Sequence, residues 1–239
     1  ALRQELTDAW SSRTQTGLFR SPFTAFLYER GWRQGFANAG FPGIEKEYEE
    51  AIAFFEPAYG GIAVDMSCGS GLMTRRLMSS EHFQRVLALD YSEAMLTETR
   101  RRIREEKLPT EALTLCRADV AALPLATDSV DAMHAGAALH CWPRLDEGLS
   151  EISRVLKPNG RFFATTFLKG AYGLPRDNPM GSGGSNGFRF FELDELRELL
   201  IAAGFPADNV EVRKEGQGCA IVKATMGESS VSSESRSSE

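Results

Sequence analysis

Residues 62–71, IAVDMSCGSG, combine an apolar run, an acidic residue and a turn that contains two glycines. The apolar run predicts a buried strand that ends near Asp65, and Gly69 and Gly71 predict a tight turn into a helix. Glycine takes left-handed backbone conformations without steric cost and lets main-chain N–H groups approach a ligand closely. We therefore expect a ligand site where this strand ends, although an ordinary strand-to-helix turn would give the same pattern.

The spacing of the two glycines limits the choice of ligand. A dinucleotide fingerprint places a third glycine three residues after the second, and that position is Thr74. A P-loop is excluded because no Gly-Lys-Ser/Thr sequence follows. An acidic strand end also suits a ligand with positive charge better than a phosphate. The pattern therefore disfavours a nicotinamide-dependent oxidoreductase, which remains as an alternative.

From residue 61 onward, strand-like and helix-like segments alternate, which is typical of a parallel sheet with helices on both faces. The expected strands are 61–66, 85–90, 113–118, 130–136, 160–168, 208–214 and 218–225, and the expected helices are 71–80, 92–107, 145–156 and 192–203. Glycines between the last two strands predict an antiparallel hairpin at the sheet edge. The predicted fold class is α/β, with seven mostly parallel strands.

Composition divides the chain into three parts. Residues 1–58 are rich in aromatics and predict a helical cap or lid, residues 59–226 carry the sheet, and residues 227–239 are of low complexity and expected to be disordered. The cap is expected to contain helices at 22–38 and 43–56. Most aromatic stripes of this kind are simply core, so a lid is one of two interpretations. A loop expected at residues 170–187 could also cover the site.

Charge and cysteine content exclude several classes of protein. The net charge of −6 and the pI near 5.3 argue against a nucleic-acid partner, and the basic run at 100–104 predicts a solvated helix face. The four cysteines show no C-x-x-C spacing, so we expect reduced thiols, neither a disulfide framework nor a metal site, and an intracellular or organellar compartment. No apolar stretch reaches the roughly 18 residues of a membrane span. The start at Ala1 instead of Met suggests trimming, for example of a targeting peptide.

Acidic residues end or follow three successive expected strands. They are Asp65, Asp90 and Asp119, at the edge of a parallel sheet where ligands bind. Asp90 lies 19 residues after Gly71, the distance at which a carboxylate can accept hydrogen bonds from both ribose hydroxyls. Asp119 could accept from an adenine amino group while Val120 packs on the ring. Any one of them could be only a helix cap, but three in succession indicate a binding pocket.

Five segments together resemble a known family: DMSCGSG, ALDYSEAML, RADVAALPL, VDAMHAGAALHCW and EISRVLKPNGRF. They are similar to the class I S-adenosylmethionine-dependent methyltransferases, in particular to the ubiquinone/menaquinone-biosynthesis type. The segments LFRSPFTAFLYERGWRQGFANAGFPGIEKEYE and HAGAALHCWP resemble poorly characterised plant and algal chloroplast methyltransferases still more closely. The resemblance implies a Rossmann-like fold, S-adenosylmethionine as cofactor, S-adenosylhomocysteine as product and a plastid location.

The resemblance also implies roles for individual residues. The cofactor-binding residues would be Asp65, Ser67, Cys68, Gly69 and Gly71 around the methionine part, Asp90 and Tyr91 at the ribose, Asp119 and Val120 at adenine, and Ala135 with His140 near the sulfonium. The substrate-binding residues would be Tyr28, Trp32, His140 and Trp142. The family usually has glycine at the position of Ser67. Since serine does not easily take a positive φ, the sequence does not decide which backbone path the loop follows at Ser67.

The implied reaction is an in-line displacement in which a nucleophile attacks the methyl group of a sulfonium. Positioning supplies most of the rate in such a reaction, about 7 to 11 kcal/mol, and no metal is required. His140, just beyond the strand at 130–136, is the candidate catalytic base, with a structural or substrate-binding role as the alternative. His134, inside that strand, is expected to be packed or hydrogen-bonded.

The absence of certain motifs limits the range of possible methyl acceptors. No Asn/Asp-Pro-Pro-aromatic sequence follows the strand at 130–136, where amino-methylating nucleic-acid enzymes carry one. We expect methyl transfer to carbon or oxygen of a small lipophilic or aromatic acceptor, prenylquinone-like by analogy, enclosed by the N-terminal aromatics and the loop at 170–187. A protein that binds the cofactor without catalysis is the other alternative. The expected assembly is a monomer or a weak homodimer.

Overall fold

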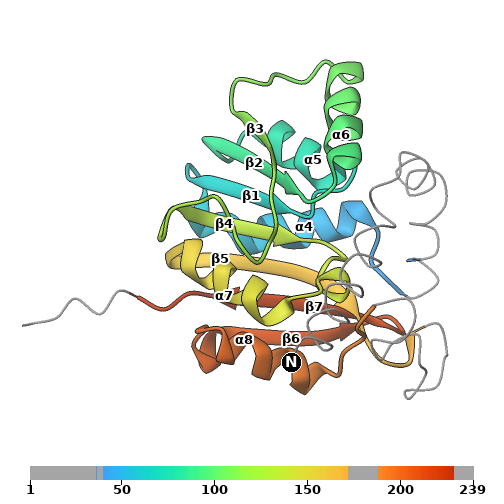
Figure 1. The fold of residues 1–239 in the computed structure, drawn as a ribbon, viewed down its shortest axis with the longest axis vertical. Coiled ribbons are helices and arrows are strands. Elements are labelled where there is room, and N and C mark those ends of the chain that lie inside the picture. The colour runs from blue at the N-terminus through green and yellow to red at the C-terminus, as the bar shows by residue number, and fades with distance from the viewer. Residues whose placement is uncertain (1–35, 37–39, 172–187, 229–239) are drawn as a thin grey trace, which may run out of the picture.

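The computed structural model describes residues 36, 40–171 and 188–228 of the 239-residue chain. All but Phe36 of the helix expected at 22–38, most of the loop expected at 170–187 and all but two residues of the tail at 227–239 lie outside the described residues. The described part is one sheet with helices on its two faces (Figure 1).

The sheet contains seven strands, as the sequence predicts, and their order is β3-β2-β1-β4-β5-β7-β6. The strands are β1 (Ile62–Met66), β2 (Arg85–Asp90), β3 (Leu113–Arg117), β4 (Val130–Ala135), β5 (Leu156–Phe167), β6 (Val210–Glu215) and β7 (Cys219–Thr225). The first five strands are parallel to one another, while β7 pairs antiparallel with both β5 and β6. The parallel order reverses between β1 and β4, which is the switch point where ligands bind in open sheets.

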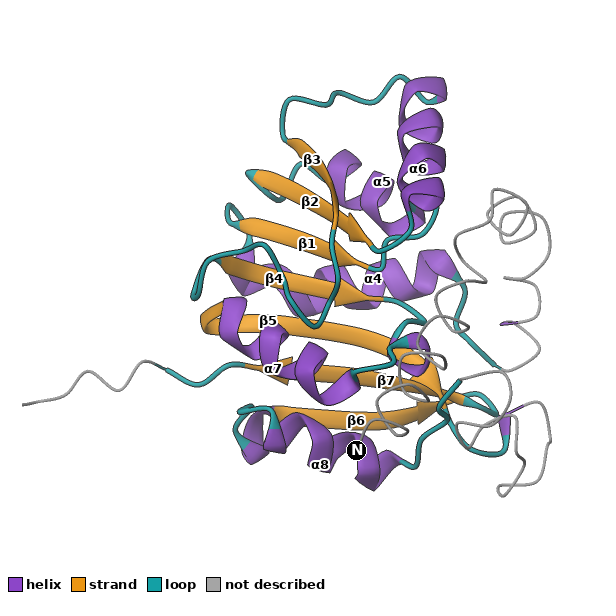
Figure 2. Cartoon of the chain, viewed as in Figure 1, coloured by secondary structure: helices purple, strands orange, loops and turns teal. Residues whose placement is uncertain are grey.

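Helices lie against the sheet (Figure 2), and buried apolar side chains hold them there. The helices are α4 (Ile44–Phe55), α5 (Leu72–Ser79), α6 (Glu93–Glu105), α7 (Leu145–Val155) and α8 (Leu193–Ala202), with short 3₁₀ turns at Glu56–Ala58, Leu139–Cys141 and Ala207–Asn209. One core cluster joins α4 and α5 to one face of the sheet, and a larger one joins α7 and α8 to the other face. The predicted helices on both faces are therefore confirmed.

The main departure from the expected boundaries is the start of β5. The strand begins at Leu156, directly after α7, and not at residue 160. Leu156 pairs with Val130, and the register then shifts so that Arg161 pairs with Ala132. Asn159, in the shifted segment, takes a φ of 63°. This pairing depends on a neighbouring strand, so the local Lys-Pro-Asn-Gly sequence, which is typical of a turn, does not indicate it.

Helix α4 shares the core of the sheet domain. It ends at Phe55, two residues before Pro57, and its buried side chains Ala51 and Phe55 are fully inaccessible. The division between a cap at 1–58 and a sheet domain at 59–226 remains a prediction, and α4 lies on the cap side of it. Among the described residues, no helix combines the length and apolar character that a membrane crossing needs.

Candidate cofactor and acceptor site

The turn after β1 takes the conformation that its glycines predict. Gly69 and Gly71 have φ values of 57° and 77°. The N–H of Gly69 donates to Asp90 Oδ2 over 2.9 Å, and the N–H of Cys68 donates to the carbonyl of Leu89 over 3.0 Å. These bonds hold the turn against the end of β2. The carboxyl ends of β1 and β2 therefore lie side by side at one edge of the sheet, which we call the rim of the site.

Ser67 occupies the left-handed region with a φ of 58°. Such a conformation is uncommon for a residue with a β-carbon and costs roughly 1 kcal/mol or more. The indole N–H of Trp142 donates to Ser67 Oγ over 3.0 Å. The serine therefore follows the glycine-like path of the loop, and its hydroxyl ties the loop to the segment after β4.

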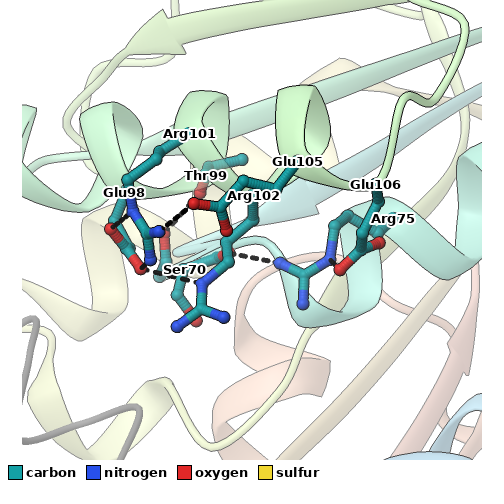
Figure 3. Close-up of polar contacts among 9 residues, drawn as sticks. Ser70, Arg75, Glu98, Thr99, Arg101, Arg102, Glu105 and Glu106 are labelled. Atoms are coloured by element: carbon teal, nitrogen blue, oxygen red, sulfur yellow. Dashed lines mark hydrogen bonds and ion pairs between the residues drawn. The ribbon is translucent and has the colours of Figure 1, made fainter.

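Helices α5 and α6 hold the turn from behind. Thr99 Oγ1 donates to the carbonyl of Gly69 and Arg75 Nη1 donates to the carbonyl of Ser70, each over 2.8 Å. Figure 3 shows the Arg75 guanidinium reaching both Ser70 and Glu106, and its Nε lies 2.9 Å from Glu106 Oε1. A β-carbon on Gly71 would lie 2.5 Å from Thr99 Cγ2. Close helix packing, as well as backbone conformation, therefore requires glycine at position 71.

Asp90, the residue expected at the ribose, ends β2 with both carboxylate oxygens hydrogen-bonded to the backbone. Its two carboxylate oxygens accept hydrogen bonds from the N–H groups of Ser92 and Gly69, over 2.8 and 2.9 Å. Burial raises the pKa of Asp90 to about 6, against the opposing effect of these two hydrogen bonds. Each oxygen keeps a second lone pair for a ligand hydroxyl. These two acceptor oxygens therefore have the chemistry that a pair of ribose hydroxyls requires.

The adenine side of the rim is more open. Asp119 accepts from the N–H of Ala121 over 3.0 Å and forms an ion pair with Arg144 at 2.8 Å. Arg117 lies over the ring of Tyr91, with its guanidinium carbon 5.5 Å from the ring centroid, and its Nε donates to the Tyr91 carbonyl.

Val120, Ala135 and Cys68 are all buried, so each can line the site only in part. Val120 packs near Trp142 under α7, and Ala135 ends β4 in the main core cluster. Cys68 packs with Ala88 and Leu96, and burial raises the pKa of its thiol well above the usual range. The contribution of Cys68 to a ligand site would therefore come from its backbone.

Asp65 faces the interior and not an open pocket. Its carboxylate accepts from Thr74 Oγ1 over 2.5 Å and lies 2.9 Å from Nδ1 of His134. Nε2 of His134 lies 3.1 Å from Oε1 of Glu47 on α4. His134 is thus hydrogen-bonded on both ring nitrogens, as its position inside a strand predicts. Asp65 is buried beneath the loop and supports it through these contacts.

The sequence analysis missed Glu47 and the partner role of Thr74. Glu47, Ala51 and Phe55 are spaced four residues apart, so they share one face of α4, and all three are buried. A carboxylate on an otherwise apolar helix face is a signal that could have identified Glu47. Thr74 was noted only as the position where a dinucleotide fingerprint has glycine, yet its hydroxyl binds Asp65.

His140 lies in an apolar environment on the turn after β4. Its ring packs edge-on against Phe167 at 4.8 Å and near Phe188 at 5.5 Å, and Phe36 and Phe41 also contact Phe167. Burial alone lowers the pKa of His140 to about 3, so the imidazole is neutral at physiological pH. Its Nδ1 is buried and has no hydrogen-bond partner among the described residues.

The expected substrate-binding residues are only partly placed. Tyr28 and Trp32 lie outside the described residues. Trp142 donates to Ser67 in the loop between β1 and α5, residues 67–71, which we call the cofactor loop. His140, in the same segment as Trp142, instead faces the rings of Phe167 and Phe188. The segment after β4 therefore connects a polar half of the site, at the ends of β1 to β3, with an apolar half around His140.

Comparison with known proteins shows that this chain is similar to methyltransferases. Residues 64–164 match the sequence model of a methyltransferase domain. Two chloroplastic uncharacterised methyltransferases of Arabidopsis thaliana are 55% identical over 155 residues and 43% identical over 192 residues, which cover 64% and 79% of this chain. The chain spans about half the length of these relatives, 44% and 54% respectively.

A more distant relative and a solved structure agree with this result. The ubiquinone/menaquinone biosynthesis C-methyltransferase of Acidiphilium cryptum is 35% identical over 120 residues, which are 50% of this chain and 47% of the relative. An S-adenosylmethionine-dependent methyltransferase from Aquifex aeolicus has the same fold, with a TM-score of 0.64 at 20% identity over 86% of this chain and 98% of that one. Residues 64–164 therefore carry a methyltransferase domain, and the described part of the chain has the fold of an S-adenosylmethionine-dependent methyltransferase.

Proposed function

We propose that this protein transfers the methyl group of S-adenosylmethionine to carbon or oxygen of a small lipophilic or aromatic acceptor in a plastid. The match to a methyltransferase domain and the similarity to named methyltransferases support the cofactor and the reaction class, and they weigh against the nicotinamide-dependent alternative. The names of the Arabidopsis relatives support the location. The name of the Acidiphilium relative supports an acceptor of the prenylquinone kind.

The observation that carries the acceptor class is the unpartnered Nδ1 of His140 among phenylalanine rings. A buried polar atom without a partner is unfavourable by about 1 to 3 kcal/mol, so such atoms are rare unless a ligand completes them. The surrounding rings, Phe167 and Phe188, would accept a flat apolar molecule. One hydroxyl or carbonyl group on that molecule would satisfy the imidazole.

The two halves of the site have separate tasks in this proposal. Asp90 would bind the ribose hydroxyls and Asp119 the adenine amino group, with the turn of Gly69 and Gly71 next to the methionine part. S-adenosylmethionine supplies an electrophilic methyl group on a sulfonium. Phe167 would hold the acceptor in line with that methyl group and exclude water, which is the source of most of the rate in this type of reaction.

His140 is better suited to orienting the acceptor than to removing its proton. A general base works best when its pKa lies near the working pH, and the pKa of His140 is lowered to about 3 by burial. A neutral imidazole can still accept a hydrogen bond from an acceptor hydroxyl and align the oxygen or the adjacent ring carbon. We therefore propose that His140 binds the substrate and that its role as a base is secondary.

Mass spectrometry of plastid lipid and pigment extracts, incubated with the protein and methyl-labelled cofactor, tests the proposed reaction. A labelled lipophilic or aromatic product is expected. Binding of S-adenosylhomocysteine without any labelled product, across complete extracts, would support the alternative of a binding protein without catalysis. A labelled product that is polar would contradict the proposed acceptor class.

A variant test addresses His140 directly. Replacement of His140 by Gln should lower turnover and raise the KM for the acceptor while the affinity for S-adenosylhomocysteine stays unchanged. His82, which is stacked on Tyr59 at the opposite end of β2, provides the control through His82→Gln. Unchanged turnover in the His140 variant would remove this residue from the mechanism.

A further inference from the structure

Glu47 is a carboxylate in the core of the protein. Its side chain is 6% exposed, and the residue lies on α4, outside the residues 64–164 that match the family model. Carboxylates are almost never this buried unless they are paired. Its Oε1 accepts from Thr165 Oγ1 over 3.2 Å and lies 3.1 Å from Nε2 of His134. A β-carbon on Gly136 would lie 2.4 Å from the same oxygen, so the strand end is shaped around this carboxylate.

A chain of hydrogen bonds leads from Glu47 to the cofactor loop. His134 lies between the carboxylates of Glu47 and Asp65, at 3.1 and 2.9 Å, and Thr74 donates to the other oxygen of Asp65. When both carboxylates are ionised, a histidine between them donates from both ring nitrogens, which is the protonated form. The group of two carboxylates and one imidazolium then carries a single net negative charge. Without the proton, two negative charges would share one buried site.

The same carboxylate also contacts the support of the turn after β4. Thr165 Oγ1, which donates to Glu47, accepts from the N–H of Ala137 over 2.7 Å. Ala137 takes a φ of 47°, an uncommon conformation for a residue with a β-carbon. The turn that Ala137 begins leads to His140. Glu47 therefore contacts the supports of both parts of the site: His134, which leads to the cofactor loop, and Thr165, which holds the turn before His140.

We propose that Glu47 is a positioning residue for the cofactor loop, because it holds His134 protonated and thereby fixes Asp65 where β1 enters the loop. The inference rests on the proposed function, since it assigns a task within the same cofactor site. It also makes α4 part of that site, although α4 lies outside the matched methyltransferase domain.

The surroundings of His134 agree with this role. The charged groups that face it are Glu47 from α4 and Asp65 from β1, and Phe163 of β5 stacks on its ring at 6.0 Å. The thiol of Cys219 on β7 faces Glu47, and burial raises the pKa of that thiol, so it stays neutral. Burial lowers the pKa of His134, but the hydrogen bonds to Asp65 and Glu47 outweigh burial and raise it to about 9.

Binding of S-adenosylhomocysteine, measured by calorimetry between pH 6 and 9.5, tests the proposal in E47Q. The amide keeps the shape of the side chain but removes its charge, so His134 should lose its proton about two pH units lower than in the wild type. At pH 8, E47Q should bind about tenfold more weakly, the effect of losing one charge-assisted hydrogen bond. At pH 6, where His134 is protonated again, the affinity should return to within about twofold of the wild type.

Glu50 provides a matched control on the same helix. It forms ion pairs with Arg213 and Lys223 and has no contact with His134. E50Q should bind S-adenosylhomocysteine as the wild type does at every pH. Equal affinities of E47Q and the wild type across the range would overturn the proposal. An equal weakening of E47Q at every pH would also overturn it, because that is the signature of a purely structural loss.

A measurement on the unmodified protein covers the case in which E47Q does not fold. The chain has three histidines, and nitrogen-15 NMR of labelled histidine distinguishes an imidazolium from a neutral ring. His134 should be protonated on both nitrogens at pH 8, and its titration midpoint should match the alkaline loss of cofactor affinity. A neutral His134 at pH 8 would overturn the inference. If the wild type does not bind S-adenosylhomocysteine at all, the proposed function fails instead.

Discussion

Two histidines six residues apart lie in opposite environments. His134 is held between the carboxylates of Asp65 and Glu47, which raise its pKa to about 9 in spite of burial. His140 packs among phenylalanine rings, where burial alone lowers its pKa to about 3. Both rings are almost completely inaccessible to solvent. Burial by itself therefore does not decide the charge of a histidine, and the partners within hydrogen-bond distance do.

The same contrast separates the two halves of the site. On the cofactor side, Asp65, Asp90 and Asp119 all accept hydrogen bonds from the protein before any ligand is present. On the acceptor side, Nδ1 of His140 has no partner among the described residues. A pre-organised polar half suits a ligand of fixed structure, and an apolar half with one open polar atom suits an acceptor recognised mainly by its shape. Each of the following experiments changes one side of this contrast.

The largest expected effect is the alkaline loss of stability that comes from His134. Its folded pKa of about 9 lies above the unfolded value of 6.5, so its stabilising contribution is complete below pH 6.5 and is lost as the pH rises through 9. The loss amounts to roughly 3 kcal/mol in the free energy of unfolding. Urea denaturation at several pH values should show this slope in the wild type and not in His134→Gln. If the stability of both proteins changed equally with pH, His134 would not be held in its charged form between Asp65 and Glu47.

The next effect, from His140, has the opposite sign. Its folded pKa of about 3 lies below the unfolded value of 6.5, so its contribution is present above pH 6.5 and declines as the pH falls towards 3. By pH 5 the loss should reach roughly 2 kcal/mol. The variant His140→Phe should keep more of its stability between pH 7 and pH 5 than the wild type in the same denaturation assay. An equal acid loss in both would place the imidazole in a more polar environment.

Loss of the ribose acceptor should weaken cofactor binding. In Asp90→Asn, one carboxylate oxygen is replaced by a donor, so the affinity for S-adenosylhomocysteine should fall about tenfold or more. Since the pKa of Asp90 is raised to about 6 by burial, the affinity of the wild type should also decline as the pH falls through 6. Calorimetry should show that decline in the wild type and a flatter profile in the variant. The more exposed Asp119 serves for comparison, and Asp119→Asn should have a smaller effect.

The smallest effect concerns the contact between the two halves. Ser67→Ala and Trp142→Phe each remove the 3.0 Å hydrogen bond between these side chains, at about 1 kcal/mol of unfolding free energy. The double variant should be little less stable than either single one, because both lose the same interaction. Ser67→Gly should be milder than Ser67→Ala, because glycine accepts the φ of 58° without strain. Additive effects in the double variant would show that the bond is not formed.

Much of the fold could be predicted because it depends on local patterns. Strand β2 matches its predicted bounds, and the hairpin of β6 and β7 follows from the glycines between them. The early start of β5 could not be predicted, because it depends on the pairing of Leu156 with Val130, which lies 26 residues earlier in the chain. Local sequence describes such a segment as a turn.

The site follows the same division. The positions of Asp90 and Asp119 at strand ends could be predicted from spacing alone, and the structure places both at the edge where β1 to β3 end. The backbone of Ser67 could not, because its φ depends on a path shared with Gly69 and its hydroxyl is bound by a tryptophan 75 positions away. Residues Tyr28 and Trp32 remain predictions.

The sequence by itself determined the parallel sheet, the glycine turn after Asp65 and the acidic residues at three strand ends, since each depends on spacing within one element or between neighbouring elements. Only the tertiary structure decided which of these side chains lie open at the sheet edge and which face the interior. Asp65 turned inward because His134 and Thr74 offer it hydrogen bonds from two other elements. Glu47 belongs to the proposed site because α4 packs on the sheet and brings the Glu47 carboxylate next to His134 of β4. Long-range hydrogen bonds among buried charges leave no periodic trace in a sequence, so they become visible only once the chain has folded.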